Sequence, residues 1–219
     1  MSINWSRYSI ILDLDDTLYP EMDYQASGYR ILVDTLCTHY GAIQFELQEL
    51  VNQGGDVLHS LSEHIGIPEL KESLLWIYRL HQPEIFLNPD AEAFLDTAQR
   101  KAVGVFILTD GRSISQRLKL KALGLDHLPV FISEEFANQK KPSIERFVKI
   151  QTLSPSEKYL YVGDNIKKDF LAPNKLGWLT AGLVPKSTSV HRETFLESYS
   201  FDFHPRYWVD KLTEIEDLL

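Results

Sequence analysis

Hydrophobic residues follow a helical pattern over much of the first half of the chain. From about Glu21 to Glu84 they recur every three or four positions, and no stretch alternates in the way a half-buried strand does. Gly54-Gly55, Gly66-Ile67-Pro68 and Pro83 interrupt the pattern. The region therefore predicts a compact helical unit. The segments expected to form its helices contain residues 29–36, 45–51, 57–65 and 70–80.

Strands and helices alternate through the rest of the chain. Apolar runs typical of buried strands cover residues 10–12, 103–108, 130–132, 159–162 and 178–184. Helices are expected at residues 91–101, 116–123 and 207–219. A further helix is expected to open at Lys140–Ser143, with Pro142 in its first turn, and another to follow residues 163–165 and end near Leu176. This alternation predicts an α/β protein with a parallel sheet covered on both faces, and the helical unit is an insertion between its first two strands.

Composition restricts the class of protein. The 219 residues fit one domain with an insertion, or two small domains. The net charge of −9 argues against nucleic acid or an anionic membrane as a partner. No apolar run approaches the roughly 18 residues of a membrane span, and the N-terminal residues do not resemble a signal peptide. The single cysteine, Cys37, excludes a disulfide framework. A reducing, cytoplasmic location is therefore expected, with the chain as a monomer or homodimer.

The first strand ends in an unusual group of acids. Asp13, Asp15 and Asp16 follow Ile10-Ile11-Leu12, and in an extended chain Asp13 and Asp15 project the same way. Neighbouring carboxylates repel, so the pair implies either a bound hard cation such as Mg²⁺ or a raised pKa. A solvated acidic turn after an edge strand is the alternative.

Polar groups also follow the later strands. Thr109, Lys141, Asp164 and Asp169 come after successive strands or their loops. The right-handed crossover rule brings the carboxyl ends of parallel strands to one edge of the sheet, which is where ligands bind. Acids there can hold a divalent cation through oxygen ligands, while a lysine and a hydroxyl bind an anionic group, most simply a phosphoryl group. One carboxylate can then act as a nucleophile.

These segments resemble the four motifs of the haloacid dehalogenase-like hydrolase superfamily. Asp13-Leu14-Asp15-Asp16-Thr17 is similar to its DxDxT signature, and Val105–Thr109 to its second motif. Lys141-Pro142 resembles the third-motif lysine, for which Lys140 is the rival, and Gly163–Asp169 matches the GDxxxxD form of the fourth. The resemblance implies a Rossmann-like three-layer core of residues 1–18 and 86–219, with an all-helical cap domain at residues 19–85.

The resemblance also implies roles for the residues of the first motif. Asp13 would be the nucleophile that becomes phosphorylated. Asp15 would be the general acid and base, and its backbone carbonyl would ligate Mg²⁺ together with the carboxylates of Asp13 and Asp164. Thr17 would support the local turn, and Asp16 would cap backbone amides rather than react.

Further roles carry over to the other motifs. Thr109 and Lys141 would act in catalysis and, with Asp110 and Gly111, bind the substrate phosphoryl group. Asp169 would not bind the metal itself but would orient Lys141 or a metal-bound water. Asp110 replaces the asparagine common after the second-motif threonine, and an acid there would repel phosphate unless Arg112 or the metal offsets it. A structural turn is the favoured role of Asp110.

The resulting hypothesis is a Mg²⁺-dependent phosphatase that hydrolyses a small phosphorylated metabolite through a phosphoaspartyl intermediate. Asp15 argues against the dehalogenase and phosphonatase branches, which lack an acid at this position. Two alternatives remain open, a phosphomutase and a non-catalytic phosphate-binding regulatory module. In the cap, the side chains that could line the entrance are Tyr19, Glu21 and Tyr24. Those that could contact the leaving group are Arg30, Trp76 and Arg79, although core or solvated positions are favoured for these three.

Overall fold

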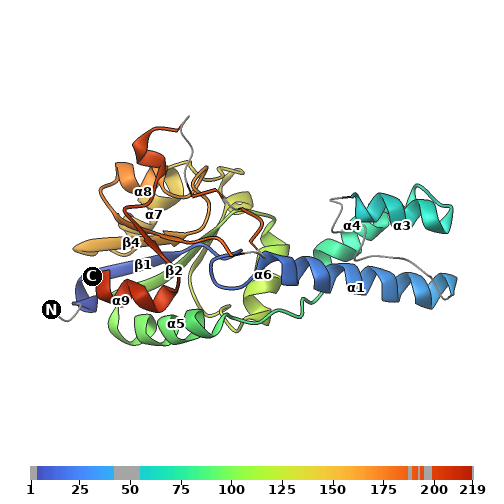
Figure 1. The fold of residues 1–219 in the computed structure, drawn as a ribbon, viewed down its shortest axis with the longest axis horizontal. Helices are drawn as coiled ribbons and strands as arrows, with labels where there is room; N and C mark the ends of the chain where they lie inside the picture. The colour runs from blue at the N-terminus through green and yellow to red at the C-terminus, as the bar shows by residue number, and fades with distance from the viewer. Residues whose placement is uncertain (1–3, 42–54, 187–188, 192, 195–198, 219) are drawn as a thin grey trace. The chain divides into compact units, whose positions relative to one another are not determined.

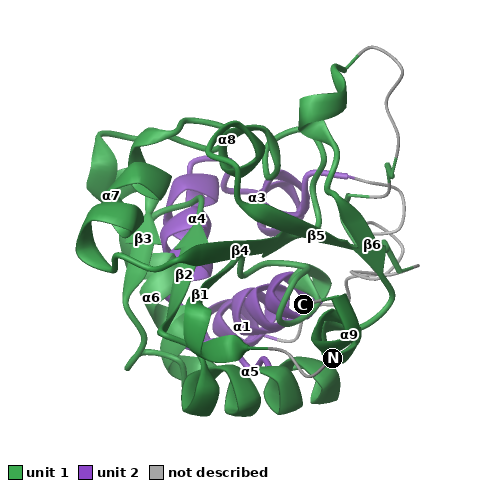
Figure 2. Cartoon of the chain, turned by 90° about the vertical axis from the view of Figure 1, so that its left-hand side faces the viewer, with its two compact units in different colours: residues 1–22, 86–219 green, residues 23–85 purple. Residues whose placement is uncertain are grey.

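The computed structural model describes residues 4–41, 55–186, 189–191, 193–194 and 199–218. The chain divides into two compact units, coloured separately in Figure 2. The first comprises Met1–Met22 with Phe86–Leu219, and the second comprises Asp23–Ile85. Within the described ranges, no helix combines the length and the apolar composition that crossing a membrane requires.

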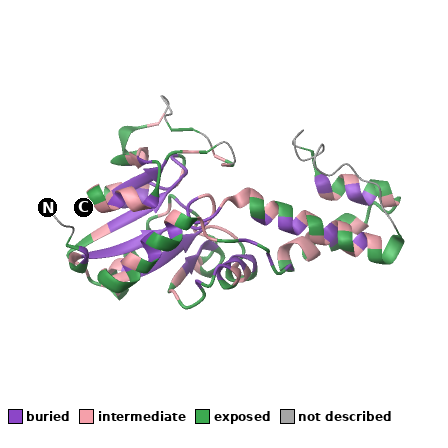
Figure 3. Cartoon of the chain, turned by 60° about the horizontal axis from the view of Figure 1, so that its bottom comes forward, coloured by how far each residue is buried: buried purple, intermediate pink, exposed green. Residues whose placement is uncertain are grey.

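The first unit is built on a parallel sheet whose described strands lie in the order β3-β2-β1-β4-β5-β6. The strands are β1 (Tyr8–Leu12), β2 (Gly104–Thr109), β3 (Val130–Ile132), β4 (Lys158–Gly163), β5 (Leu179–Leu183) and β6 (Tyr207–Val209). Every residue of β1 is buried, as its unbroken apolar run predicts for a central strand covered on both faces. Figure 3 shows the buried residues of this unit concentrated along the strands.

Helices cover both faces of the sheet. They are α5 (Pro89–Lys101), α6 (Ser113–Ala122), α7 (Glu145–Leu153), α8 (Leu171–Lys175) and α9 (Ile215–Leu218). Figures 1 and 2 show α5 and α9 on one face and α7 and α8 on the other. On the latter face Phe147 packs edge-on against Tyr161 and Trp178, with ring centroids 5.3 and 5.6 Å away. The predicted Rossmann-like three-layer core is confirmed.

The second unit is helical in its described part. It contains most of α1 (Glu21–Tyr40), together with α3 (Val57–Ile65) and α4 (Leu70–Leu80). The Asp56 side chain caps the start of α3 by accepting the His59 N–H at 3.0 Å, and Gly66 ends the helix in the left-handed conformation. The apolar stripes meet in a small core of Leu32, Leu36, Val57, Leu61 and Leu74. The helix expected around residues 45–51 lies outside the described residues.

Two expectations about secondary structure are wrong. Tyr207–Val209 is the edge strand β6 instead of the start of a helix, and only Ile215–Leu218 of that segment is α-helical. Aromatic and β-branched side chains favour a strand, and the edge of β5 supplies the hydrogen-bonding partner, but three residues are too few to show alternation in sequence. The Lys140–Ser143 segment forms a turn, in which the Ser143 N–H reaches the Lys140 carbonyl at 2.9 Å, and α7 begins only at Glu145.

Candidate active site

Three aspartates meet at the carboxyl ends of β1 and β4. Asp13 follows β1 directly, and its backbone N–H donates to the carbonyl of Val162 in β4 at 2.9 Å. Because β1 and β4 are paired in parallel, the residues after both strands lie next to each other. Asp13, Asp164 and Asp169 each offer a carboxylate oxygen within 4.8 Å of the others, and all three side chains are buried. We call this group the aspartate cluster.

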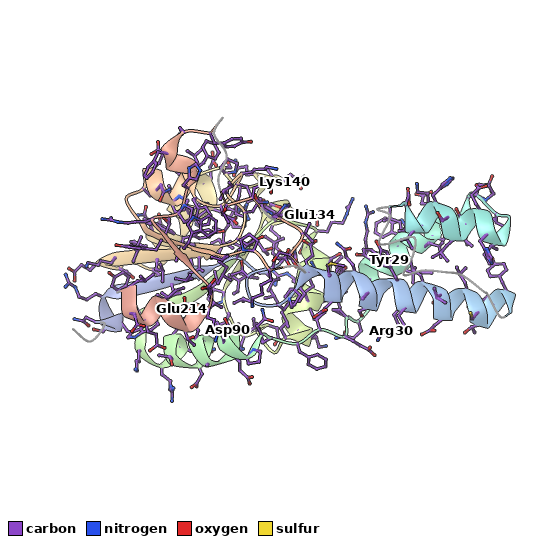
Figure 4. The ribbon with its side chains drawn as sticks, in the orientation of Figure 1. Tyr29, Arg30, Asp90, Glu134, Lys140 and Glu214 are labelled. Atoms are coloured by element: carbon purple, nitrogen blue, oxygen red, sulfur yellow. The ribbon has the colours of Figure 1, made fainter. Side chains whose placement is uncertain are left out.

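Lys141 is the lysine in direct contact with the cluster. Its Nζ lies 2.7 Å from Asp13 and 2.6 Å from Asp169, and it donates to the hydroxyl of Tyr161 at 3.1 Å. Burial alone would lower the pKa of Lys141, but Asp13 and Asp169 outweigh it and hold this pKa well above its ordinary value. Lys140, labelled in Figure 4, is exposed. The geometry thus selects Lys141 over its neighbour.

The carboxyl groups of the cluster titrate unequally. Burial raises the pKa of Asp13 to about 6, against the attraction of Lys141. Burial, then repulsion from Asp169 and Asp13, holds the pKa of Asp164 well above its ordinary value. For Asp169, the attraction of Lys141 overcomes burial and the pKa is lowered. Lys141, even with Lys168 nearby, therefore does not neutralise three buried acids.

The cluster fits a hard divalent cation. Asp164 Oδ2 is buried and has no hydrogen-bond partner among the described residues. Oxygen ligands are what Mg²⁺ prefers, and a cation would relieve the repulsion that disfavours ionisation of Asp13 and Asp164. Asp169 is held differently, since its Oδ2 accepts the backbone N–H groups of Asp164 at 3.2 Å and Asn165 at 2.8 Å. The Asp169 carboxylate is therefore already bound by two backbone N–H groups and by Lys141, as expected for a residue that orients the lysine instead of reacting.

A glycine is required beside Asp169. A Cβ atom at Gly163 would lie 2.6 Å from Asp169 Oδ2, and real Cβ atoms do not approach other atoms so closely. The glycine of the fourth motif therefore lets Asp169 fold back over its own loop.

The carboxylate of Asp15 is engaged by a different set of residues. Lys119 Nζ lies 2.8 Å from Oδ1, Gln116 Nε2 donates to Oδ2 at 3.0 Å, and the Tyr19 hydroxyl donates to Oδ1. Burial alone would raise the pKa of Asp15, but Lys119 outweighs it and the pKa lies below its ordinary value. Sequence reasoning missed both α6 residues, although their spacing of three places them on one face of a helix.

A buried arginine explains how Asp110 is tolerated. Arg146 of α7 is fully buried and pairs with Asp110, and its Nη1 donates to the carbonyls of Thr109 at 2.7 Å and Phe131 at 3.0 Å. Asp110 also accepts the backbone N–H of Lys141 at 3.1 Å. The carboxylate of Asp110 thus joins the loops that carry Thr109 and Lys141.

Arg112, the residue proposed from sequence to offset Asp110, lies elsewhere. Its Nη1 is 3.6 Å from Glu134, which is labelled in Figure 4.

Gly111 has a φ of +151°, and a Cβ there would lie 2.7 Å from Gln116 Nε2. Its N–H donates to Ser133 Oγ at 3.0 Å. The turn after β2 is therefore tied to both α6 and the end of β3.

The remaining first-motif residues shape the loop. Asp16 has a φ of +55°, and its carboxylate accepts the backbone N–H of Glu21 at 2.8 Å and of Val190 at 2.6 Å, which confirms its predicted capping role. Thr17 is buried, and its hydroxyl has no hydrogen-bond partner in the described part of the chain.

Several side chains of the helical unit have partners within that unit. Tyr24 is buried against Tyr78 and His81, whereas Arg30, labelled in Figure 4, is exposed and pairs with Glu84. Trp76 is 49% exposed, and the guanidinium of Arg79 lies over its ring at 5.6 Å.

The fold and the site together define an α/β enzyme of the Rossmann-like type. The chain belongs to the haloacid dehalogenase-like hydrolase family, whose model matches residues 10–183. The resemblance seen in the four motifs is thereby confirmed.

Three curated relatives are phosphatases. The chain is 25% identical to a ribulose-1,5-bisphosphate 5-phosphatase of Halopiger xanaduensis, over 96% of this chain and 98% of the relative. It is 26% identical to a glyceraldehyde 3-phosphate phosphatase of Methanopyrus kandleri, over 96% of each. A phosphoserine phosphatase of Thermus thermophilus is 31% identical over 58% of this chain and 54% of the relative.

Solved structures share the fold. The HAD-hydrolase YfnB of Bacillus subtilis, in a crystal structure bound to magnesium, has a TM-score of 0.65 and 20% identity, covering 98% of this chain and 99% of YfnB. A HAD-superfamily hydrolase of Geobacter sulfurreducens has a TM-score of 0.66 and 20% identity, with both chains covered completely.

Removing the buried arginine should destabilise the protein strongly. Arg146→Met leaves the Asp110 carboxylate without its main partner and removes a donor from two carbonyls, so the free energy of unfolding should fall by about 3–5 kcal/mol. Urea denaturation measures this change. Arg117→Met is the matched control, because Arg117 pairs with Glu135 at the surface, where a pair contributes about 1 kcal/mol or less. Equal effects of the two substitutions would show that Arg146 is not a structural centre of the site.

Glu21 should make the stability of the protein depend on pH. Burial, followed by repulsion from Asp15 and Asp16 and opposed by Lys119 and Lys168, raises the pKa of Glu21 to about 7 from an ordinary 4.5. Because the folded protein binds this proton more tightly than the unfolded chain does, Glu21 contributes fully to stability below its unfolded pKa of about 4.5. This contribution is lost as the pH rises through about 7.

Glu21→Gln removes this dependence. Relative to the native protein, the variant should gain about 1–3 kcal/mol in free energy of unfolding between pH 5 and pH 8. Denaturation curves at both values, without added divalent cation, measure the gain. Asp126→Asn, at an exposed position, is the control and should show no such change. A constant difference between Glu21→Gln and native protein at both pH values would refute the raised pKa.

Proposed function

We propose that this hydrolase is a Mg²⁺-dependent phosphatase that cleaves a small phosphorylated metabolite through a phosphoaspartyl intermediate. The observation that carries the proposal is the ion pair of buried Asp13 with Lys141 beside Asp164. The phosphatase names of the three curated relatives support the same class of substrate. The helical unit is proposed as the cap domain that the family resemblance implies.

In the first half-reaction, a carboxylate oxygen of Asp13 attacks phosphorus while the bond between phosphorus and the leaving oxygen breaks. Asp15 is ionised in the site as it stands, because Lys119 lowers its pKa. We propose that it takes up a proton when the anionic phosphoryl group binds beside it, and then gives this proton to the leaving oxygen as the alcohol departs. Lys141 and the Thr109 hydroxyl neutralise and hold the phosphoryl oxygens during transfer. Lys141 also keeps the Asp13 carboxylate in one orientation, since the two side chains are 2.7 Å apart.

In the second half-reaction, water attacks the phosphorus of the aspartyl phosphate. Asp15, now ionised, takes the proton of the water, the bond between phosphorus and the Asp13 oxygen breaks, and inorganic phosphate leaves. The site returns to its starting protonation state. Asp13, Asp164 and the backbone carbonyl of Asp15 would hold the metal, which supplies positive charge next to the phosphoryl oxygens when bound.

Loss of the nucleophile should abolish turnover. Asp13→Asn cannot form the acyl phosphate, so release of phosphate from an aryl phosphate with Mg²⁺ should fall by at least about 1,000-fold, or about 4 kcal/mol. A panel of phosphorylated metabolites assayed for phosphate release measures this and identifies the natural substrate class. Asp126→Asn should keep full activity. A fully active Asp13→Asn would refute the nucleophile assignment, and turnover that requires a bisphosphate would favour the phosphomutase.

Magnesium should stabilise the folded protein through Asp164. A ligand present at 100 times its Kd adds about 2.7 kcal/mol to the free energy of unfolding, so Mg²⁺ should raise the Tm of the native protein. Asp164→Asn should lose this increase. Without metal it should be at least as stable as the native protein, because it removes a buried acid whose pKa is raised. An unchanged Mg²⁺ response in this variant would place the metal elsewhere.

A further inference from the structure

One turn of α6 holds both oxygens of the Asp15 carboxylate. Gln116 and Lys119 are three residues apart, so their side chains lie on the same face of the helix. Gln116 Nε2 donates to Oδ2 at 3.0 Å, and Lys119 Nζ lies 2.8 Å from Oδ1. Both residues are buried, at 3% and 5% exposure. We call this pair of donors the α6 clamp.

The clamp is itself fixed to the rest of the site. Gln116 Nε2 also donates to the backbone carbonyl of Asp110 at 2.8 Å, next to the glycine whose missing Cβ makes room for the Gln116 side chain. A further donor, from outside α6, is Tyr19, whose hydroxyl reaches Asp15 from within the loop of the first motif. The Asp15 carboxylate is therefore held from two directions, in a position connected to the end of β2.

A buried lysine needs a reason beyond stability. Taking an ammonium group out of water is energetically costly, and its pairing with a carboxylate often does no more than offset that cost. An apolar side chain at position 119 would have filled the same space without this cost. Lys119 instead places a positive charge on the carboxylate whose position matters for proton transfer, and this carboxylate also repels the charge of Glu21.

We propose that Lys119 is a positioning residue for the hydrolysis, which holds the Asp15 carboxyl where it can reach the leaving oxygen. The inference rests on the proposed function. Without Lys119, the Asp15 carboxylate loses its ion-pair partner, its repulsion from Glu21 is no longer offset, and Asp15 takes up other orientations. The loss should then depend on the leaving group, because a nitrophenolate departs without a proton whereas an alkoxide requires one.

The test compares two esters in the same variants. The probes are 4-nitrophenyl phosphate and the best alkyl phosphate found for the native protein, both with Mg²⁺. Lys119→Met should lower the single-turnover rate of alcohol release from the alkyl ester by about 10- to 100-fold, and that of nitrophenolate release by less than about 5-fold. This rate reports the first half-reaction alone, because hydrolysis of the aspartyl phosphate is common to both esters. Lys119→Arg, which keeps the charge, should recover part of the loss. Lys121→Met, on the exposed side of the same helix, should behave as the native protein.

A double substitution separates positioning from a general effect on the fold. If Lys119 acts through Asp15, Asp15→Asn combined with Lys119→Met should be no slower on the alkyl ester than Asp15→Asn alone. Thermal unfolding checks that each variant is folded. If Lys119→Met is not, Gln116→Leu, which removes the other donor of the clamp, is compared in the same way.

Two results would overturn the inference. Equal losses of the single-turnover release rate on both esters, or a further loss in the double variant, would show that Lys119 is structural only. A native protein that releases phosphate from neither ester nor from any metabolite of the panel would refute the proposed function itself, and the role of Lys119 with it. The first outcome leaves the phosphatase assignment intact, so the two failures are distinguishable.

Discussion

The contact on which the site depends is the double ion pair of Lys141. A single ammonium group touches Asp13 and Asp169 at 2.7 and 2.6 Å, and the three side chains are almost completely removed from water. A buried ion pair of this kind contributes little net stability compared with apolar residues of the same volume. Its value is in geometry, since it places two carboxylates from different strand ends against one another at a distance that their charges alone would not permit.

The parallel sheet makes this arrangement possible. Asp13 and Asp164 follow neighbouring strands, while Asp110 and Lys141 are brought in by loops that Arg146 fastens together. Three buried cations pair with these groups, with Lys141 at the aspartate cluster, Arg146 at the turn after β2 and Lys119 at Asp15. Burying these three positive charges is costly, but their ion pairs fix the positions of the carboxylates in the site.

Much of this fold could be predicted from local sequence. The apolar runs that became β1, β2 and β4 are long or uniform enough to indicate buried strands, and the acids that follow them lie where parallel strands must end. The three-residue strand β6 could not be predicted, because its pairing depends on the edge of β5 instead of on its own pattern. The turn at Lys140–Ser143 was missed for a similar reason, as its backbone is held by Asp110, which lies 31 positions before Lys141 in the chain.

The positions of the buried cations Arg146 and Lys119 could not be predicted from the sequence, for a further reason. The chain has 22 lysines and arginines, and sequence shows which of them stand beside a motif but not which are buried. Arg146 and Lys119 lie on amphipathic helices, where a charged residue is expected to face solvent. They turn inward because a carboxylate from a distant segment lies at that point, and that carboxylate in each case belongs to a motif or is adjacent to one. A motif therefore identifies the reacting groups, whereas the residues that hold those groups in place become visible only when the strands are assembled.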